Sequence, residues 1–100
     1  MIKNTYEFKS KVLVFPGTGA WHFVRVPEET SNEINFFFAE NKRGWGSLPV
    51  KVTVVESEWD TSIFFDKKSK TFMLPLKAKI RKEESIKEGD NIEVTLKVKT

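Results

Sequence analysis

Hydrophobic and polar residues alternate along much of this chain, a pattern typical of β-strands with one buried face. In the first such stretch Tyr6, Phe8 and Val12 share one parity, while Glu7 and Lys9 share the other. Together with the turn signals between them, similar stretches predict further strands over residues 21–26, 47–55, 59–65, 71–76 and 92–98.

The hydrophobic period changes to that of a helix in two places. In the first, Ile34, Phe37 and Phe38 fall on one helical face, with acidic residues near the start of the segment. We therefore expect a helix that runs to about Lys42. A second, shorter helix is expected over residues 77–84.

Strand, turn, strand, helix and strand follow one another twice along the chain. Pro27 and Pro75 lie 48 residues apart at the end of the second strand of each series, which supports an internal repeat. Two such units can pair their strands around one barrel and leave no exposed edge. We therefore predict one all-β domain over residues 1–100, a closed barrel of two β-β-α-β units with a helix at each end.

Composition sets the size of the core and the expected compartment. A chain of 100 residues with 39% hydrophobic and 13% aromatic side chains is long enough for one small domain. It contains no cysteine, which is compatible with a reducing compartment. Because we find neither a signal peptide nor an apolar run of about 20 residues, we expect a cytoplasmic protein without a membrane partner.

The sequence offers no convincing set of residues for catalysis. Its single histidine, His22, shares strand parity with Val24 and Val26, which favours a hydrogen-bonded structural role. Acidic residues occur as adjacent pairs such as Glu28 and Glu29, whose members do not share a helical face, and this disfavours a metal site. The glycines lack the spacing of a phosphate-binding loop. We therefore expect no enzyme activity, no metal and no cofactor.

The last third of the chain carries the pattern of a known class of regulators. Its residues are Leu74, Pro75, Ile80, Arg81, Ile86, Gly89 and Asp90. In this pattern the chain is similar to the swapped-hairpin barrel of AbrB- and MazE-like regulators, which are homodimers of one such unit. The resemblance implies that both units are fused here, so that the dimerisation is internal and the protein is a monomer.

Several spaced motifs match one bacterial family along nearly the whole chain. They are Trp21-His22-Phe23, Gly44-Trp45-Gly46, Trp59-Asp60-Thr61-Ser62, Leu74-Pro75-Leu76-Lys77 and Arg81-Lys82. In these motifs the chain resembles the small bacterial family catalogued as domain of unknown function nineteen-hundred-and-five. The resemblance implies a double-split β-barrel and no particular reaction or ligand.

Basic residues are concentrated in the C-terminal part of the chain. Residues 1–65 hold seven Lys or Arg and eight Asp or Glu, whereas residues 66–100 hold ten and six. From residue 67 to residue 82 every charged side chain is a cation, which favours an anionic partner. Because AbrB-like barrels include DNA-binding regulators, one hypothesis is nucleic-acid binding by Lys67, Lys68, Lys70, Lys79 and Lys82. The equivalent first-half segment, "VPEETSNEI", is acidic and argues against it.

A pocket for an anion is the other hypothesis. Lys77 and Arg81 stand four apart on the expected helix, a like-charge pair that costs about 0.2–0.5 kcal/mol unless something compensates it. A bound anion would compensate it, and so would local ion pairs to Glu83 and Glu84. The expected site residues are Arg43, Trp45, Lys77, Arg81, Trp21 and Trp59. We thus expect a binding module for an anionic small molecule or an acidic partner, with a nucleic-acid-binding regulator as the alternative.

Overall fold

Strands and helices follow one another in the order that the sequence predicts. The structure, a computed structural model, describes residues 3–16 and 21–99, apart from the side chain of Trp45. The elements of these residues are β1 (Thr5–Lys11), β2 (Leu13–Val14), β3 (His22–Arg25), α1 (Glu28–Phe38), η1 (Ala39–Asn41), η2 (Gly44–Gly46), β4 (Ser47–Val54), β5 (Ser57–Asp66), β6 (Thr71–Pro75), α2 (Ala78–Glu83) and β7 (Asn91–Val98). The first predicted strand is divided into β1 and β2 at Val12.

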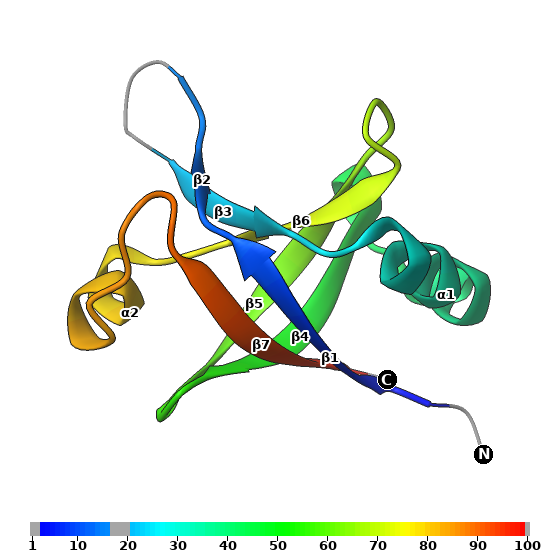
Figure 1. Ribbon diagram of the computed structural model, residues 1–100. Coiled ribbons are helices and arrows are strands. Elements are labelled where there is room, and N and C mark those ends of the chain that lie inside the picture. Colours follow the sequence, from blue (N-terminus) through cyan, green and yellow to red (C-terminus); the bar gives the residue numbers. More distant parts are fainter. Residues whose placement is uncertain (1–2, 17–20, 100) are drawn as a thin grey trace.

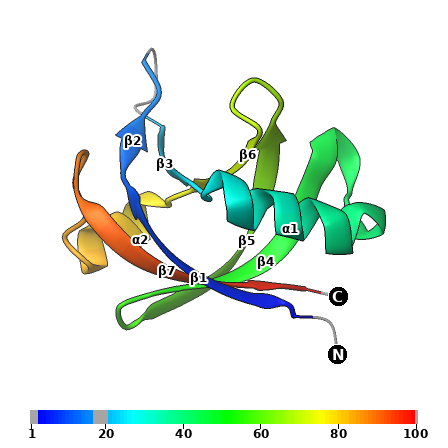
Figure 2. The same ribbon diagram turned by 45° about the vertical axis from the view of Figure 1, so that its right-hand side comes forward.

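The strands form one antiparallel sheet in the order β1-β7-β4-β5-β6-β3-β2. Since Val12 alone separates β1 from β2, one continuous stretch of chain occupies both ends of this order. β1 pairs with β7 and β2 pairs with β3, and the backbone N–H of Val12 donates to the carbonyl of Asp90. The sheet curls on itself, with α1 and α2 on opposite sides of it (Figures 1 and 2). The predicted all-β class with two short helices is confirmed.

Alternate residues of the central strands fill the core inside the curled sheet. Val50 and Val52 of β4 are fully buried, whereas Lys51 between them is exposed. Burial alternates in the same way over most of β7. Phe72 of β6 is the largest of the fully buried side chains among the described residues. The strand periodicity read from the sequence therefore identifies the core face correctly.

A twofold rotation about an axis through the β3/β6 pair relates the strand order of the two halves of the chain. The N–H of Val26 donates to the carbonyl of Phe72, and the N–H of Leu76 donates to the carbonyl of His22, both at 2.9 Å. Positions 26 and 76 correspond in this pair, and the helices that follow begin at Glu28 and Ala78, so the repeat measures 50 residues. The 48-residue alignment of the two prolines is wrong, because one proline directly precedes α1 and the other lies within β6.

The buried stripe of α1 runs through Ser31, Ile34 and Phe38. Phe37, which the sequence places on the same face, remains 42% exposed. At 3.6 residues per turn, Ser31 and Phe38 lie on one side of Ile34 and Phe37 lies on the other. The helix is therefore rotated so that a small hydroxyl, instead of a second phenyl ring, faces the sheet.

The Ser31 hydroxyl connects α1 to strand β6 and to Val26, the residue that follows β3. It donates to the carbonyl of Val26 at 3.0 Å and accepts from the N–H of Phe72 at 3.0 Å. All three groups are buried, so neither backbone group can exchange this partner for water. This satisfaction of two backbone groups explains why serine occupies the first position of the stripe.

Both helices end close to the predicted residues. α1 stops at Phe38 and continues as the 3-10 turn η1, which ends one residue before Lys42. α2 covers Ala78–Glu83 and is one residue shorter at each end than expected. None of the helices in the described ranges is long and apolar enough to cross a bilayer.

Candidate functional site

Three alternate positions of one strand segment place two aromatic rings and a cation in a column. Trp21, Phe23 and Arg25 share one parity, while Val24 between them is fully buried in the core. The rings of Trp21 and Phe23 are stacked, with centroids 5.3 Å apart and an angle of 22° between their planes. The guanidinium carbon of Arg25 lies 5.3 Å from the Phe23 centroid, within the range of a cation–π contact.

Phe15, next to β2, completes this aromatic group. Its ring centroid lies 5.4 Å from that of Trp21 and 5.1 Å from that of Phe23. Phe23 is buried beneath these neighbours, whereas Phe15 is 44% exposed and Trp21 is 39% exposed. Two large aromatic side chains therefore meet solvent, and both contact Phe23, which also contacts the half-buried Arg25.

Three oxygens fix the guanidinium of Arg25 through a single nitrogen. Nη1 donates to Ser69 Oγ at 2.8 Å, to Asp66 Oδ2 at 3.1 Å and to Thr71 Oγ1 at 3.3 Å. A guanidinium has five N–H donors, of which two are on Nη1. Among the described residues, none accepts a hydrogen bond from Nε or Nη2 of Arg25, so these nitrogens retain donor capacity.

Asp66 is held in its charged form. Hydrogen bonds from the Ser69 hydroxyl and from the backbone N–H of Lys68, together with the charge of Arg25, keep the pKa of the Asp66 carboxyl below its ordinary value. The carboxylate therefore orients Arg25 at neutral pH. The Asp66 and Arg25 side chains keep 24% and 33% of their surfaces exposed, so water still screens the pair.

A cavity of about 570 Å³ opens beside this arginine. It is lined by Phe15, Arg25, Asp66, Lys68, Ser69 and Met73. Met73 reaches it because it pairs directly with Arg25 across β3 and β6. The two segments that flank the cavity, the β2/β3 pair and the β5–β6 turn, rise from the same end of the sheet (Figures 1 and 2). The described residues of the lining include two cations and one carboxylate, so their net charge is positive. Phe15 provides an aromatic wall.

Two of the predicted site residues border a different cavity. Trp59 and Lys77 line a space of about 360 Å³ together with Lys79. Three carboxylates, those of Glu56, Glu58 and Glu83, also line it. Because acidic side chains outnumber the cations here, this cavity does not suit the anion for which its residues were selected.

Arg81 has a structural contact. Its Nε donates to the carbonyl of Leu76 at 3.3 Å. Positions 31 and 26 lie 50 residues before positions 81 and 76, and there the Ser31 hydroxyl donates to the carbonyl of Val26. The predicted local ion pairs from Arg81 and Lys79 to the helical glutamates are not formed among the described residues. Both glutamates instead accept hydrogen bonds from Ser57, at 3.3 and 2.6 Å.

Arg43 lies far from the α2 residues with which it was expected to converge. Its N–H donates to the carbonyl of Ser47, the first residue of β4, whereas Ser57, just beyond the other end of β4, contacts α2. Since β4 has eight residues, about 20 Å separates these two ends. The expectation of one common pocket is therefore wrong for Arg43, and the side chain of Trp45 lies outside the described residues.

The basic segment is divided between two places. Lys67, Lys68 and Lys70 belong to the β5–β6 turn, whereas Lys79 and Lys82 belong to α2. These elements lie at opposite ends of β6 and far apart in both views (Figures 1 and 2). The predicted lysines do not form a single surface, and of the five only Lys68 borders the Arg25 cavity.

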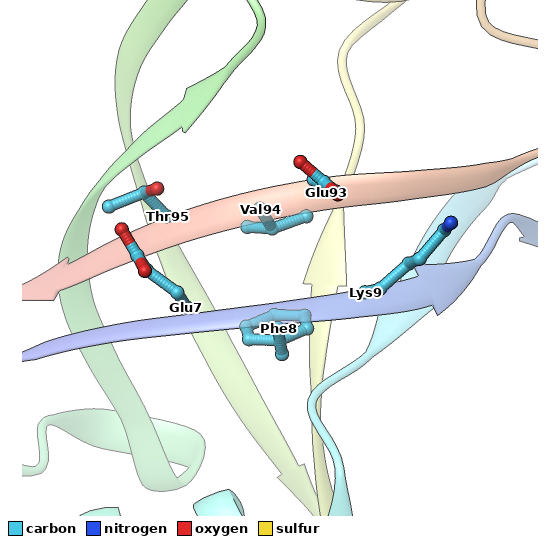
Figure 3. Close-up of a pocket in the computed structure, with 6 residues that line it drawn as sticks. All are labelled: Glu7, Phe8, Lys9, Glu93, Val94 and Thr95. Atoms are coloured by element: carbon cyan, nitrogen blue, oxygen red, sulfur yellow. The ribbon is translucent and has the colours of Figure 1, made fainter.

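A third concavity, of about 330 Å³, lies on the outer face of β1 and β7. Glu7 and Lys9 project to the same side as Glu93 and Thr95 of the paired strand, while the Phe8 and Val94 side chains turn to the opposite side (Figure 3). The cross-strand register sets Lys9 against Glu93 and accounts for this mixture of charges. No group of three or more metal-binding side chains occurs in residues 3–16 and 21–99.

One family model matches most of this sequence. The model of the family described as domain of unknown function, DUF1905, matches residues 8–96. The chain belongs to the DUF1905 family. The matched range includes every described residue that lines the Arg25 cavity. No curated protein matches the sequence significantly.

Sequence-based prediction identified Lys68, which lines this cavity, and Trp21, which belongs to the aromatic group beside it. It missed Arg25, although the segment "WHFVR" carried a usable signal. Two aromatic residues and an arginine alternate there with core-facing valine, so an apolar and a cationic side chain share the outer face. The contribution of Asp66 could not be detected locally, because it lies 41 positions from Arg25.

Proposed function

We propose that this protein is a binding module for an anionic small molecule and that Arg25 binds the charged group of the ligand. The observation that supports this most directly is the partial use of the Arg25 guanidinium. Nη1 donates to three protein oxygens, no described residue accepts a hydrogen bond from Nε or Nη2, and Arg25 lines a cavity of about 570 Å³. Nε and Nη2 offer two parallel N–H groups, which is the geometry for bidentate binding of a carboxylate or a phosphate.

Preorganisation strengthens this proposal. The bonds through Nη1 and the contact with Phe23 immobilise the guanidinium before a ligand arrives. Side-chain ordering therefore costs little on binding. Lys68 adds a second cation to the lining, and Asp66 orients Arg25 without cancelling the net positive charge.

The size and composition of the cavity favour a small molecule. Its volume lies within the range of about 300–1,000 Å³ that is usual for ligand sites, which combine apolar walls with a few placed polar groups. Phe15 and Met73 provide such walls, and Arg25, Lys68 and Ser69 provide the polar groups. A long nucleic acid would instead require a continuous basic surface, whereas the lysines of the basic segment lie at two separate places.

A thermal-shift experiment tests this function. Unfolding is followed with acetate, benzoate, phosphate or pyrophosphate against chloride at matched ionic strength, because a ligand of the native state raises the melting temperature. We expect at least one anion to raise the melting temperature of the wild-type protein. The shift should disappear in Arg25→Ala and decrease in Arg25→Lys, which keeps the charge but loses the bidentate edge. The matched control Arg43→Ala should retain it. An equal shift in wild type and Arg25→Ala, or no shift with any anion, contradicts the proposal.

We further propose that the curled sheet closes as a double-split barrel and that the protein is a cytoplasmic monomer. Support for closure comes from the continuous β1–β2 segment, which pairs with β7 at one end and with β3 at the other. Because both repeat units belong to one chain, no second chain is needed to complete the strand pairing. Light scattering that reports a stable dimer would contradict the monomer.

A further inference from the structure

We infer that the ligand of the Arg25 cavity carries a planar aromatic ring beside its anionic group. This inference rests on the proposed function and specifies the class of ligand. Phe15 and Arg25 line the same cavity and both contact Phe23, so a molecule bound to the guanidinium can also contact the phenyl ring of Phe15. The aromatic ring of such a ligand thus contacts Phe15, and its charged group binds the adjacent Arg25.

The exposure of Phe15 and Trp21 requires an explanation that the core does not provide. They belong to an aromatic group on the outer face of β2 and β3, on the opposite side from Val24. Burial of Phe23 requires some cover, but 44% of Phe15 and 39% of Trp21 still meet solvent. Aromatic rings in contact prefer offset or tilted arrangements at centroid distances of about 4.5–7 Å. The three rings already satisfy this preference at 5.1–5.4 Å, so a further ring can extend the group in the same geometry.

Electrostatics favours an aromatic ring over a saturated one of similar size. A flat ring presents its π-face to Phe15 and its edge to neighbouring groups, and it can also accept a cation such as Lys68 over its face. Burial of apolar area alone would predict the opposite preference, because a saturated ring is thicker and exposes more apolar surface. The two contributions can therefore be separated by comparing ligands that differ only in ring saturation.

The experiment compares benzoate with cyclohexanecarboxylate, which have the same charge and six-membered rings. Dissociation constants are measured by NMR titration at fixed ionic strength. For the wild-type protein we expect benzoate to bind about threefold to tenfold more tightly, which is the range for one aromatic contact. Phe15→Leu, which keeps an apolar side chain but removes the ring, should abolish this ratio. Phe36→Leu changes an exposed phenylalanine on α1 and should leave it unchanged.

The outcomes distinguish the ligand class from the function. If both acids bind the wild-type protein equally well, or if the saturated acid binds more tightly, the aromatic ligand is excluded while anion binding stands. If the preference for benzoate persists in Phe15→Leu, the ring lies elsewhere and the inference is wrong. If neither acid binds, and the anions of the thermal-shift experiment also have no effect, the proposed function itself is wrong. A preference that is lost in Phe15→Leu and retained in Phe36→Leu supports both.

Discussion

Asp66 accepts a hydrogen bond from Nη1 of Arg25 at 3.1 Å, although the two residues lie 41 positions apart in the sequence. Each is the last residue of its strand, β5 for Asp66 and β3 for Arg25. Their contact joins the two segments that flank the 570 Å³ cavity. The same ion pair therefore joins these segments and engages Nη1, while no described residue accepts a hydrogen bond from Nε or Nη2.

Asp66 should make the stability of the protein sensitive to acid. Its carboxyl has a lower pKa in the folded protein than its ordinary value of about 3.9, so folding favours the ionised form. This contribution is complete above the unfolded pKa and is lost as the pH falls through the folded pKa. Asp66→Asn should therefore unfold at a lower urea concentration at pH 7 and show a weaker loss of stability between pH 5 and pH 2. Urea titrations over this range measure both effects.

The exposed Glu40 provides a control for this titration, because none of the described residues bonds to its side chain. Glu40→Gln removes one carboxylate, as Asp66→Asn does, without removing an ion pair. We expect its acid dependence to follow the wild-type protein. Identical profiles for the two variants would show that the contacts of Asp66 do not stabilise the fold.

Removal of the Ser31 hydroxyl should destabilise the protein far more than its small size indicates. In Ser31→Ala the buried N–H of Phe72 loses its acceptor, which costs about 1–3 kcal/mol. The expected loss is measured as a decrease in the free energy of unfolding by urea. Asn32→Ala alters the adjacent, exposed position of the same helix and should change this free energy by about 0.5 kcal/mol or less. Equal effects of the two variants would contradict the role of the hydroxyl.

Phe36 and Phe38 should differ strongly in their contribution to stability. Phe38 is buried against the sheet, so Phe38→Ala leaves a cavity and should cost about 3–5 kcal/mol. Phe36 is 80% exposed and contacts Phe37 edge to face, and we expect Phe36→Ala to cost less than about 1.5 kcal/mol. Thermal or urea unfolding of the pair provides the comparison. A larger loss for Phe36→Ala would mean that α1 packs with a different face.

Local periodicity explains how much of the fold could be predicted. The strand that contains Val50 and Val52 was identified because side chains alternate with period two, whichever strand it pairs with. The rotation of α1 could not be identified in this way. It depends on the bond of Ser31 to Phe72, a residue 41 positions away, and not on the hydrophobicity of Phe37.

The site depends even more on long-range register. Trp21, Phe23 and Arg25 share a face for a local reason, but Met73 joins them only because β3 and β6 pair in one register. Asp66 joins them because β6 pairs with β5 on one side and with β3 on the other, which brings the end of β5 close to the end of β3. Lys77 and Arg81 were selected for their helical spacing, and that spacing contains no information about the carboxylates that surround Lys77.

Two lysines of the basic segment distinguish the observed site from the predicted one. Lys68 borders the Arg25 cavity, whereas Lys79 borders the cavity that contains Trp59 and Lys77. Removing one partly screened charge near a bound anion costs about 0.3–1 kcal/mol, which corresponds to about a twofold to fivefold weaker affinity. We expect Lys68→Ala to weaken benzoate binding by this factor and Lys79→Ala to leave it unchanged, as measured by NMR titration. Because the two variants change net charge equally, a long-range field would weaken binding in both. Weakening in Lys79→Ala alone would move the site to the α2 cavity.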